Sequence, residues 1–307
     1  MVKRAAKEEC MAANDVVGSV AELWRFPVKS MRGERLDQTE LTERGILGDR
    51  AYALIDVDTD KVVSASSVKL FPNLLGCQAT FVDPPQSGQE FPLVRITLPD
   101  GTSVSSESGD VNRVLSACFN REVTLARAAP EGLTIDQYHS DVENLDPAGH
   151  RDTVVEQKLG SAKRAEVGLV SPVLEGSFFD ELPVSVLTTS TLERLSELEP
   201  KSRFDQARFR MNVIVATSEP GFLENDWVGH KLGIGPTARL AVALPDPRCV
   251  MTTLAQENLP KDTEILRTLA RHNSIQVGDK GQLPCAGVYA VLDAPGPVQT
   301  GDRVRLI

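Results

Sequence analysis

The sequence has few cysteines, and no two of them are spaced as a Cys-x-x-Cys pair. The five are Cys10, Cys77, Cys118, Cys249 and Cys285. An odd number of widely spaced thiols excludes a disulfide framework and the usual zinc and iron–sulfur signatures. This usage is typical of a reducing compartment, so we expect a cytoplasmic protein.

Long apolar runs and an excess of positive charge are also lacking. With 33 Lys and Arg against 43 Asp and Glu, the net charge is −10, which argues against a nucleic-acid partner. No apolar run approaches the roughly 18 residues that span a bilayer, so we expect no integral membrane segment. Residues 1–15 lack the apolar core of a secretory signal, and we expect a flexible tail there. The glycine-rich phosphate loops and the Gly-x-Ser-x-Gly elbow are missing, which disfavours nucleotide-driven and serine-hydrolase chemistry.

What the chain does contain is a series of short strand-forming runs. Up to residue 127, such runs are separated by Gly, Pro and Asp clusters at roughly 10-residue spacing, which is typical of a closed or nearly closed β architecture. Strands are predicted at residues 16–26, 36–41, 50–57, 61–64, 76–82, 93–98 and 122–127, and a helix at 109–118. The sequence therefore predicts a mainly β fold with a few helices, of the all-β barrel or α+β class.

The second half continues this pattern after a long connection. Residues 131–176 are polar and rich in Gly and Pro, with one predicted strand at 166–170. Strands follow at 183–187, 213–216, 227–232, 238–243, 250–254, 286–292 and 304–307, with helices at 188–199 and 262–272. The length of 307 residues favours two domains, which we place at 16–130 and 131–307.

One stretch, residues 244–253, carries the strongest chemical signal. Pro245 and Pro247 are expected to hold Asp246, Arg248 and Cys249 in a rigid loop before a strand. A fixed positive charge favours the thiolate form of a neighbouring cysteine, and a thiolate is a ligand for a soft metal. The alternative is a turn in which Cys249 is simply half-buried.

Further candidates lie at predicted strand and helix ends in both halves: Lys29, Ser30, Arg50, Thr188, Arg210 and Asn212. Thr188 caps a predicted helix whose N-terminus offers an anion site. Arg210 and Asn212 share one face of an extended segment, where a guanidinium and a carboxamide suit a planar, phosphate-bearing ligand. A rim ion pair of Arg210 with Asp205 or Glu219 is the alternative. Together the set describes a cleft for an anionic organic cofactor with a metal at its tip.

Five motifs in this order resemble those of MOSC proteins, which are named for the C-terminal domain of molybdenum cofactor sulfurase. They are Pro27-Val28-Lys29-Ser30, Gly48-Asp49-Arg50, Arg208-Phe209-Arg210-Met211-Asn212, Arg248-Cys249-Val250-Met251-Thr252-Thr253 and Gly301-Asp302-Arg303-Val304. More closely, the chain resembles the two-domain subgroup that contains the amidoxime reducing component. The resemblance implies an N-terminal β-barrel domain in 16–130 and a MOSC β-barrel domain in 131–307.

The resemblance also implies roles for the candidate residues. Cys249 matches the cysteine that ligates molybdenum. The positions that hold the pterin and its phosphate are matched by Lys29, Ser30, Arg50, Thr188, Arg210, Asn212 and Arg248. Asp246 stands where relatives often have a further cysteine, and it is a candidate proton donor beside Cys249. The implied cofactor is a molybdenum–molybdopterin, which carries the redox chemistry.

The function implied is reduction of N-hydroxylated or N-oxide substrates by oxygen-atom transfer. We expect a separate electron donor of the ferredoxin, flavoprotein or cytochrome b5 kind, because no ferredoxin-like cysteine set is present. Pyridoxal phosphate binding is associated with the family, although we expect no sulfurase domain here. Two alternatives remain: a carrier that holds the cofactor, or sulfur as a persulfide on Cys249, and a structural β protein with a vestigial pocket.

Overall fold

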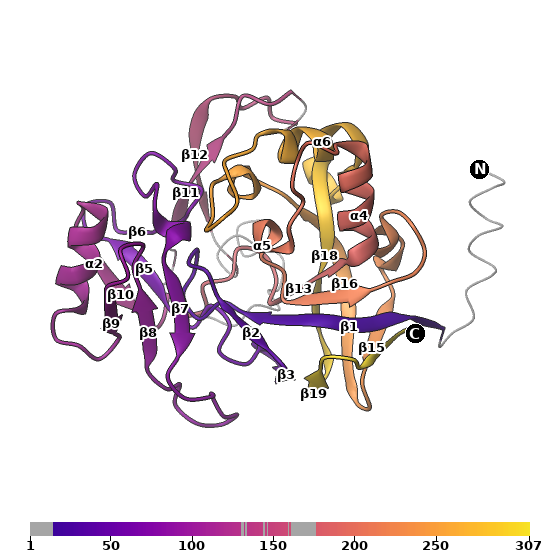
Figure 1. Ribbon diagram of the computed structural model, residues 1–307, viewed down its shortest axis with the longest axis horizontal. Coiled ribbons are helices and arrows are strands. Elements are labelled where there is room, and N and C mark those ends of the chain that lie inside the picture. The colour runs from indigo at the N-terminus through magenta and orange to yellow at the C-terminus, as the bar shows by residue number, and fades with distance from the viewer. Residues whose placement is uncertain are drawn as a thin grey trace.

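The computed structural model describes residues 15–129, 132, 134–143, 145, 147–158, 160 and 176–307. Strands dominate this part of the chain, and four α-helices accompany them. Figure 1 shows the segment from β5 to β10 on one side, a larger group of strands around β1, β16 and β18 on the other, and the β11–β12 hairpin above both. The mainly β class predicted from the sequence is confirmed.

The larger group of strands is a closed seven-stranded barrel. Its order is β13 (Val184–Thr188), β14 (Val213–Ala216), β1 (Val16–Arg25), β20 (Arg303–Leu306), β15 (Lys231–Ile234), β16 (Ala238–Pro247) and β18 (Gln282–Ala294), and β13 pairs with β18 to close it. β13 and β14 run parallel, and the other neighbours in the ring are antiparallel. Leu23, Val186, Leu232 and Leu240 belong to the buried apolar cluster of these strands. Closure leaves no free edge in the ring, which suits a domain of this size.

Three helices pack against the barrel: α4 (Thr189–Leu198), α5 (Gln206–Phe209) and α6 (Glu264–His272). The first and last were predicted, since the sequence of each has a candidate capping residue followed by an apolar face. Leu195 from α4 and Leu266 from α6 meet Ile214 of β14 in one buried cluster. β2 (Glu34–Leu36) pairs with β1, and β17 (Ser274–Gln276) with β18. The 3-10 helices η2 (Leu223–Trp227) and η4 (Gly278–Lys280) lie in connections.

The N-terminal half adds smaller sheets around its own core. β5 (Ala53–Asp56) lies between β6 (Lys61–Val62) and β10 (Val123–Ala126), and β7 (Gln78–Phe81), β8 (Val94–Thr97) and β9 (Ser103–Ser105) form a second sheet. β3 (Gln38–Thr42) pairs with β4 (Gly45–Ile46) and with β19 (Gly296–Gln299), and η1 (Leu74–Gly76) and α2 (Val111–Phe119) complete the half. Met251 and Leu254, which follow Cys249, pack against this core. The two halves therefore meet next to Cys249.

Two local predictions around Cys249 were wrong. The prolines do not form a loop, because β16 continues to Pro247. Its pairing with β18 shifts register between Val242 and Leu244 and again between Pro245 and Pro247. Irregular pairing tolerates residues that have no N–H to donate. The predicted strand at 250–254 is the 3-10 helix η3 (Val250–Thr253), where Thr252 and Thr253 donate their hydroxyls to the carbonyls three residues earlier.

Part of the connection at 131–176 forms a hairpin that was not predicted. β11 (Thr134–His139) pairs with β12 (Thr153–Lys158). The predicted strand at 166–170 lies outside the described residues. By sequence, β1 lies in the first predicted domain, yet it pairs with β14 and β20 of the barrel. The domain boundary near residue 130 stays a prediction. Within the described ranges, no helix is long and apolar enough to cross a membrane.

Candidate functional site

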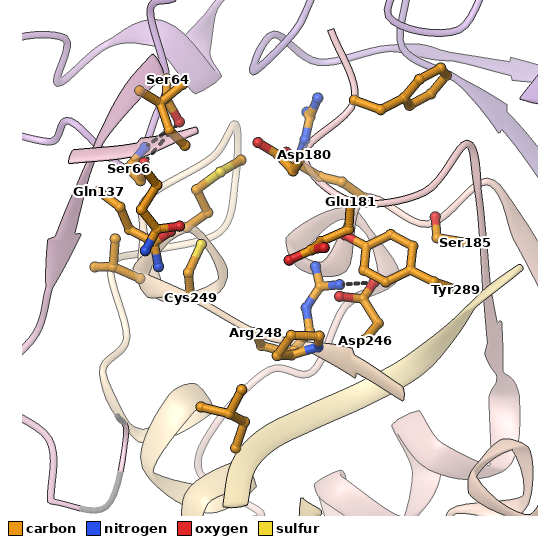
Figure 2. Close-up of a pocket in the computed structure, with 18 of the residues that line it drawn as sticks. Ser64, Ser66, Gln137, Asp180, Glu181, Ser185, Asp246, Arg248, Cys249 and Tyr289 are labelled. Carbon is orange, nitrogen blue, oxygen red and sulfur yellow. Dashed lines mark hydrogen bonds and ion pairs between the residues drawn. The ribbon is translucent and has the colours of Figure 1, made fainter. Parts of the chain in front are cut away.

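A cavity of about 470 Å³ lies where the barrel, the N-terminal half and the hairpin meet. Five of the predicted cofactor residues line it: Arg50, Arg210, Asn212, Arg248 and Cys249, and Asp246 lines it as well. Figure 2 shows Arg248, Asp246 and Tyr289 on one side and Ser64, Ser66 and Gln137 on the other. The sequence motifs therefore converge on one space although they come from distant parts of the chain.

Asp246 and Arg248 form a buried ion pair at the end of β16. Arg248 Nη1 donates to Asp246 Oδ2, and the Arg248 backbone N–H donates to the Pro284 carbonyl at 2.8 Å. Burial raises the pKa of Asp246 to about 7, although the guanidinium opposes the shift. Asp246 Oδ1 and Arg248 Nε are buried and make no hydrogen bond within the described ranges. Buried polar atoms of this kind usually have partners, so both are suited to a bound ligand.

The thiol of Cys249 is half-buried at the start of η3 and faces the same cavity. Burial raises its pKa, and the backbone N–H of Met251 and the Arg248 charge only partly oppose this. The expectation that Arg248 keeps the free sulfur ionised was therefore wrong. The negative charges of Asp180 and of Asp246, which pairs with Arg248, raise the pKa of the thiol and so counteract the Arg248 charge.

Arg210 is the least compensated charge of the site. Its side chain is only 6% exposed, Nη1 donates to the Met31 carbonyl at 2.6 Å, and the guanidinium lies 4.3 Å from the Phe26 ring centroid. Within the described residues it forms no ion pair, so the alternative of a rim ion pair is not supported. Burial and the nearby Arg50 guanidinium lower the pKa of Arg210 to about 9, and the charges of Asp49 and Asp180 only partly oppose this. An anion bound in the cavity would offset this cost.

Asp49, which was not singled out from the sequence, organises the neighbouring residues. Its Oδ1 accepts from the Phe26 N–H at 2.7 Å, and its Oδ2 accepts from Asn212 Nδ2 at 3.0 Å and from Arg50. Asn212 Oδ1 accepts from the backbone and hydroxyl of Ser185. The carboxamide of Asn212 is thus engaged within the protein, and it fixes Asp49, which in turn fixes Arg50.

The remaining predicted residues are not among those that line the cavity. Lys29 lies directly behind it, and its Nζ donates to Asp180 Oδ1 at 2.7 Å and to the Phe178 carbonyl at 2.9 Å. Burial lowers the pKa of Lys29, and Asp180, which lines the cavity, opposes the shift. Ser30 is buried in a left-handed conformation with φ of 62°. Thr188 caps α4, and its hydroxyl donates to the buried Glu224 at 2.7 Å.

Two further residues were missed by sequence reasoning. Arg208 is fully buried and donates to the carbonyls of Arg203, Thr252, Leu254 and Pro260, so it anchors the segment after Cys249. Tyr289 of β18 lines the cavity, and burial together with Asp246 raises its pKa well above the ordinary value. Arg208 lies inside a recognised motif, whereas no local signal marks Tyr289.

The donor set fits a phosphate-bearing, metal-containing organic cofactor. Guanidiniums pair with phosphate in a bidentate way, and a thiol that faces the same space can ligate a soft or high-valent metal once it is deprotonated. Arg210 lacks an ion-pair partner, and Arg248 Nε lacks a hydrogen-bond partner, within the described ranges, so both are available. In the part of the chain that the structure describes, no cluster of three or more His, Cys, Asp or Glu side chains is placed to hold a metal ion.

Fold and cavity together define a two-part β protein whose barrel presents a cysteine beside buried cations. The MOSC domain family matches residues 174–305, and the MOSC N-terminal beta barrel domain family matches residues 17–141. The chain therefore belongs to the MOSC domain family, as the sequence motifs indicated.

Several relatives cover nearly the whole chain. The human mitochondrial amidoxime-reducing component 1 is 24% identical over 95% of this chain and 83% of its own length. Mitochondrial amidoxime reducing component 2 of Bos taurus is 25% identical over 94% and 83%, and component 1 of Xenopus laevis is 27% identical over 94% and 82%. These matches support a molybdenum-cofactor-related reductase at the level of the family.

Proposed function

We propose that this protein reduces N-hydroxylated or N-oxide substrates with a molybdenum–molybdopterin cofactor that Cys249 ligates. The observation that carries the proposal is that Arg210 and Cys249 line the same cavity. Arg210 is a buried guanidinium that forms no ion pair in the described residues. A buried uncompensated charge is costly unless a ligand neutralises it. The names of the relatives support the substrate class.

The other residues of the site would bind and orient the cofactor. Arg50 and Arg210 would hold the phosphate, and Arg248 would donate through Nε. Asn212 would position Asp49 by a hydrogen bond, and Lys29 would position Asp180 in the same way. Ser30 would set the turn that follows Lys29, and Thr188 would hold the helix α4 beside β14.

When bound, the cofactor supplies two-electron redox chemistry. For an amidoxime, the overall reaction takes two electrons and two protons and yields an amidine and water. The electrons would come from a separate donor protein, for which a ferredoxin, a flavoprotein and a cytochrome b5 are candidates. Asp246 would hold one proton at Oδ1, the buried oxygen that has no hydrogen-bond partner within the described ranges.

The test is metal and pterin analysis of protein from a molybdate-fed, cofactor-competent host, followed by benzamidoxime reduction with a reduced viologen. We expect near-stoichiometric molybdenum and pterin and measurable turnover in the wild type, and loss of both metal and turnover in Cys249→Ala. Cys118→Ala, in the N-terminal half, is the matched thiol control. Pterin without metal would favour the carrier alternative. Absence of both would refute the proposal.

A further inference from the structure

The cavity has a second wall that the proposed cofactor site does not use. Ser64 and Ser66 contribute to it from the segment after β6, and Ile135, Gln137 and His139 contribute from β11. Alternate residues of a strand point to the same face, so the last three form one row with Gln137 in its middle. Figure 2 shows Ser64, Ser66 and Gln137 on the side of the cavity where Cys249 lies.

The carboxamide of Gln137 is placed to bind a ligand. It is half-buried at the cavity and makes no hydrogen bond to any part of the chain that the structure describes. A carboxamide offers an acceptor oxygen and two N–H donors, one of which lies beside the oxygen on the same planar edge. Leaving such a group in a partly buried place without partners is unfavourable, and a ligand that pairs with it gains accordingly.

The backbone on both sides of Gln137 is fixed. Lys61 Nζ donates to Asp136 Oδ1 at 2.7 Å and also pairs with Glu156, and Ser67 Oγ donates to the Asp136 carbonyl at 2.7 Å. The Tyr138 N–H donates to the Ser66 carbonyl at 3.2 Å. The hairpin is thus tied to the N-terminal half on either side of Gln137. A side chain on a fixed backbone can position a ligand accurately.

We propose that Gln137 is a specificity-determining residue that binds the head group of a neutral, planar N-hydroxylated amidine. This inference rests on the proposed function and adds the chemistry by which the substrate is recognised. An amidoxime displays an N–H donor beside an acceptor on one edge. The Gln137 oxygen accepts from the amino group, and its NH2 donates to the oxime group.

The same arrangement discriminates against tertiary amine N-oxides. Such a compound has an acceptor oxygen and no donor, so it makes one bond to Gln137 where the amidoxime makes two. A site built to hydrogen-bond a substrate rejects an analogue that leaves its polar groups unpaired. Ser64, Ser66 and Gln137 carry no charge, which suits a neutral head group. Lys158 and His139 also line the cavity, and both have interactions within the protein. The cations Arg50, Arg210 and Arg248 are the residues proposed to bind the cofactor.

The test compares kcat/KM for benzamidoxime and for a tertiary amine N-oxide in the wild type, Gln137→Leu and the control Gln299→Leu. Gln299 is exposed on β19 and is not among the residues that line the cavity. We expect Gln137→Leu to lower the value for benzamidoxime by roughly 10- to 100-fold, mainly through KM, and the value for the N-oxide by no more than about 3-fold. Molybdenum content should be unchanged. Equal losses on both substrates would overturn the proposal.

A binding titration separates this inference from the proposed function. Benzamidoxime is titrated calorimetrically into the protein without any electron donor, so that turnover is not required. If the wild type reduces neither substrate, the proposed function fails, and binding still decides on Gln137. Weaker binding to Gln137→Leu supports the role, and equal binding overturns it. Gln137→Glu, which keeps the size and polarity, serves if the leucine variant does not fold. It should bind the benzamidine cation more tightly and benzamidoxime more weakly, and the absence of both effects would overturn the role.

Discussion

Replacing Arg210 with methionine tests whether the cavity is built to bind an anion. The lowering of its pKa from the ordinary arginine value to about 9 corresponds to ~5 kcal/mol of unfavourable free energy in the charged folded state. The variant loses the hydrogen bond to the Met31 carbonyl and the stacking on Phe26, which contribute ~2 kcal/mol together. We therefore expect cofactor-free Arg210→Met to be more stable at pH 7 by ~1–3 kcal/mol. The left-handed φ of 55° is equally strained with either side chain.

The sign of the pH dependence follows from the same shift. Because the folded pKa lies below the unfolded one, the unfolded chain binds more protons from about pH 9 up to the ordinary pKa of arginine. Stability contributed by this group rises with pH through that window, and at pH 7 the full cost is present. Arg210→Met should lack this rise.

The assay is urea unfolding of the cofactor-free protein, with and without inorganic phosphate. Tryptophan fluorescence monitors the unfolding. Phosphate that binds only the folded state should raise the midpoint of the wild type and leave Arg210→Met unchanged. Arg95→Met, which removes an exposed arginine on β8, is the control and should behave as the wild type. A variant that is less stable by 2 kcal/mol or more, or an equal phosphate effect in both proteins, would refute the reasoning.

Three further single substitutions test the roles of Cys249, Thr188 and Cys77. Cys249→Ser should lose molybdenum while its urea midpoint stays close to that of the wild type; an unfolded variant would show that the thiol serves packing. Thr188→Ala should lower the free energy of unfolding by ~1–2 kcal/mol, because the cap of α4 and the hydrogen bond from the hydroxyl to Glu224 are lost. The variant should keep its pterin content, and loss of pterin would indicate that Thr188 contacts the cofactor. Burial raises the pKa of Cys77 to about 12, so the folded state keeps a proton that the unfolded chain loses above pH 9. Stability measured by urea unfolding should therefore fall between pH 9 and 12, by ~1.4 kcal/mol at pH 10, and Cys77→Ser should not show this part of the decline.

Local patterns predicted the elements of this fold better than their pairing. The amphipathic helix α6 buries Ile265, Leu266 and Leu269, the residues whose spacing marked it. The role of β1 was not predictable, because its partners β14 and β20 lie roughly 190 or more residues further along the chain and no local signal specifies such contacts. The β11–β12 hairpin was missed since polar and Gly-rich residues surround it and weaken the strand pattern.

The candidate site shows a similar division. Sequence reasoning found the cations and the thiol, because charged residues at strand ends and a recognisable motif order mark them. It did not find how the charges are compensated. Asp205, offered as a partner of Arg210, instead pairs with Arg203 and caps α5, whereas Arg50 is paired with its own neighbour Asp49. Compensation depends on which side chains meet in space, and that is a property of the tertiary fold.

The placement of Cys249 explains why two halves are needed for one site. The segment before it is a barrel strand, and the segment after it packs against the N-terminal core through Met251 and Leu254. Arg208 joins the two by holding the carbonyls of Thr252 and Leu254 from a helix of the barrel domain. The thiol therefore cannot shift relative to either half without disturbing a core. Arg210 and Arg248 come from the barrel half, and Gln137 comes from the β11–β12 hairpin, so in the proposed arrangement this shared segment would set the distance between cofactor and substrate.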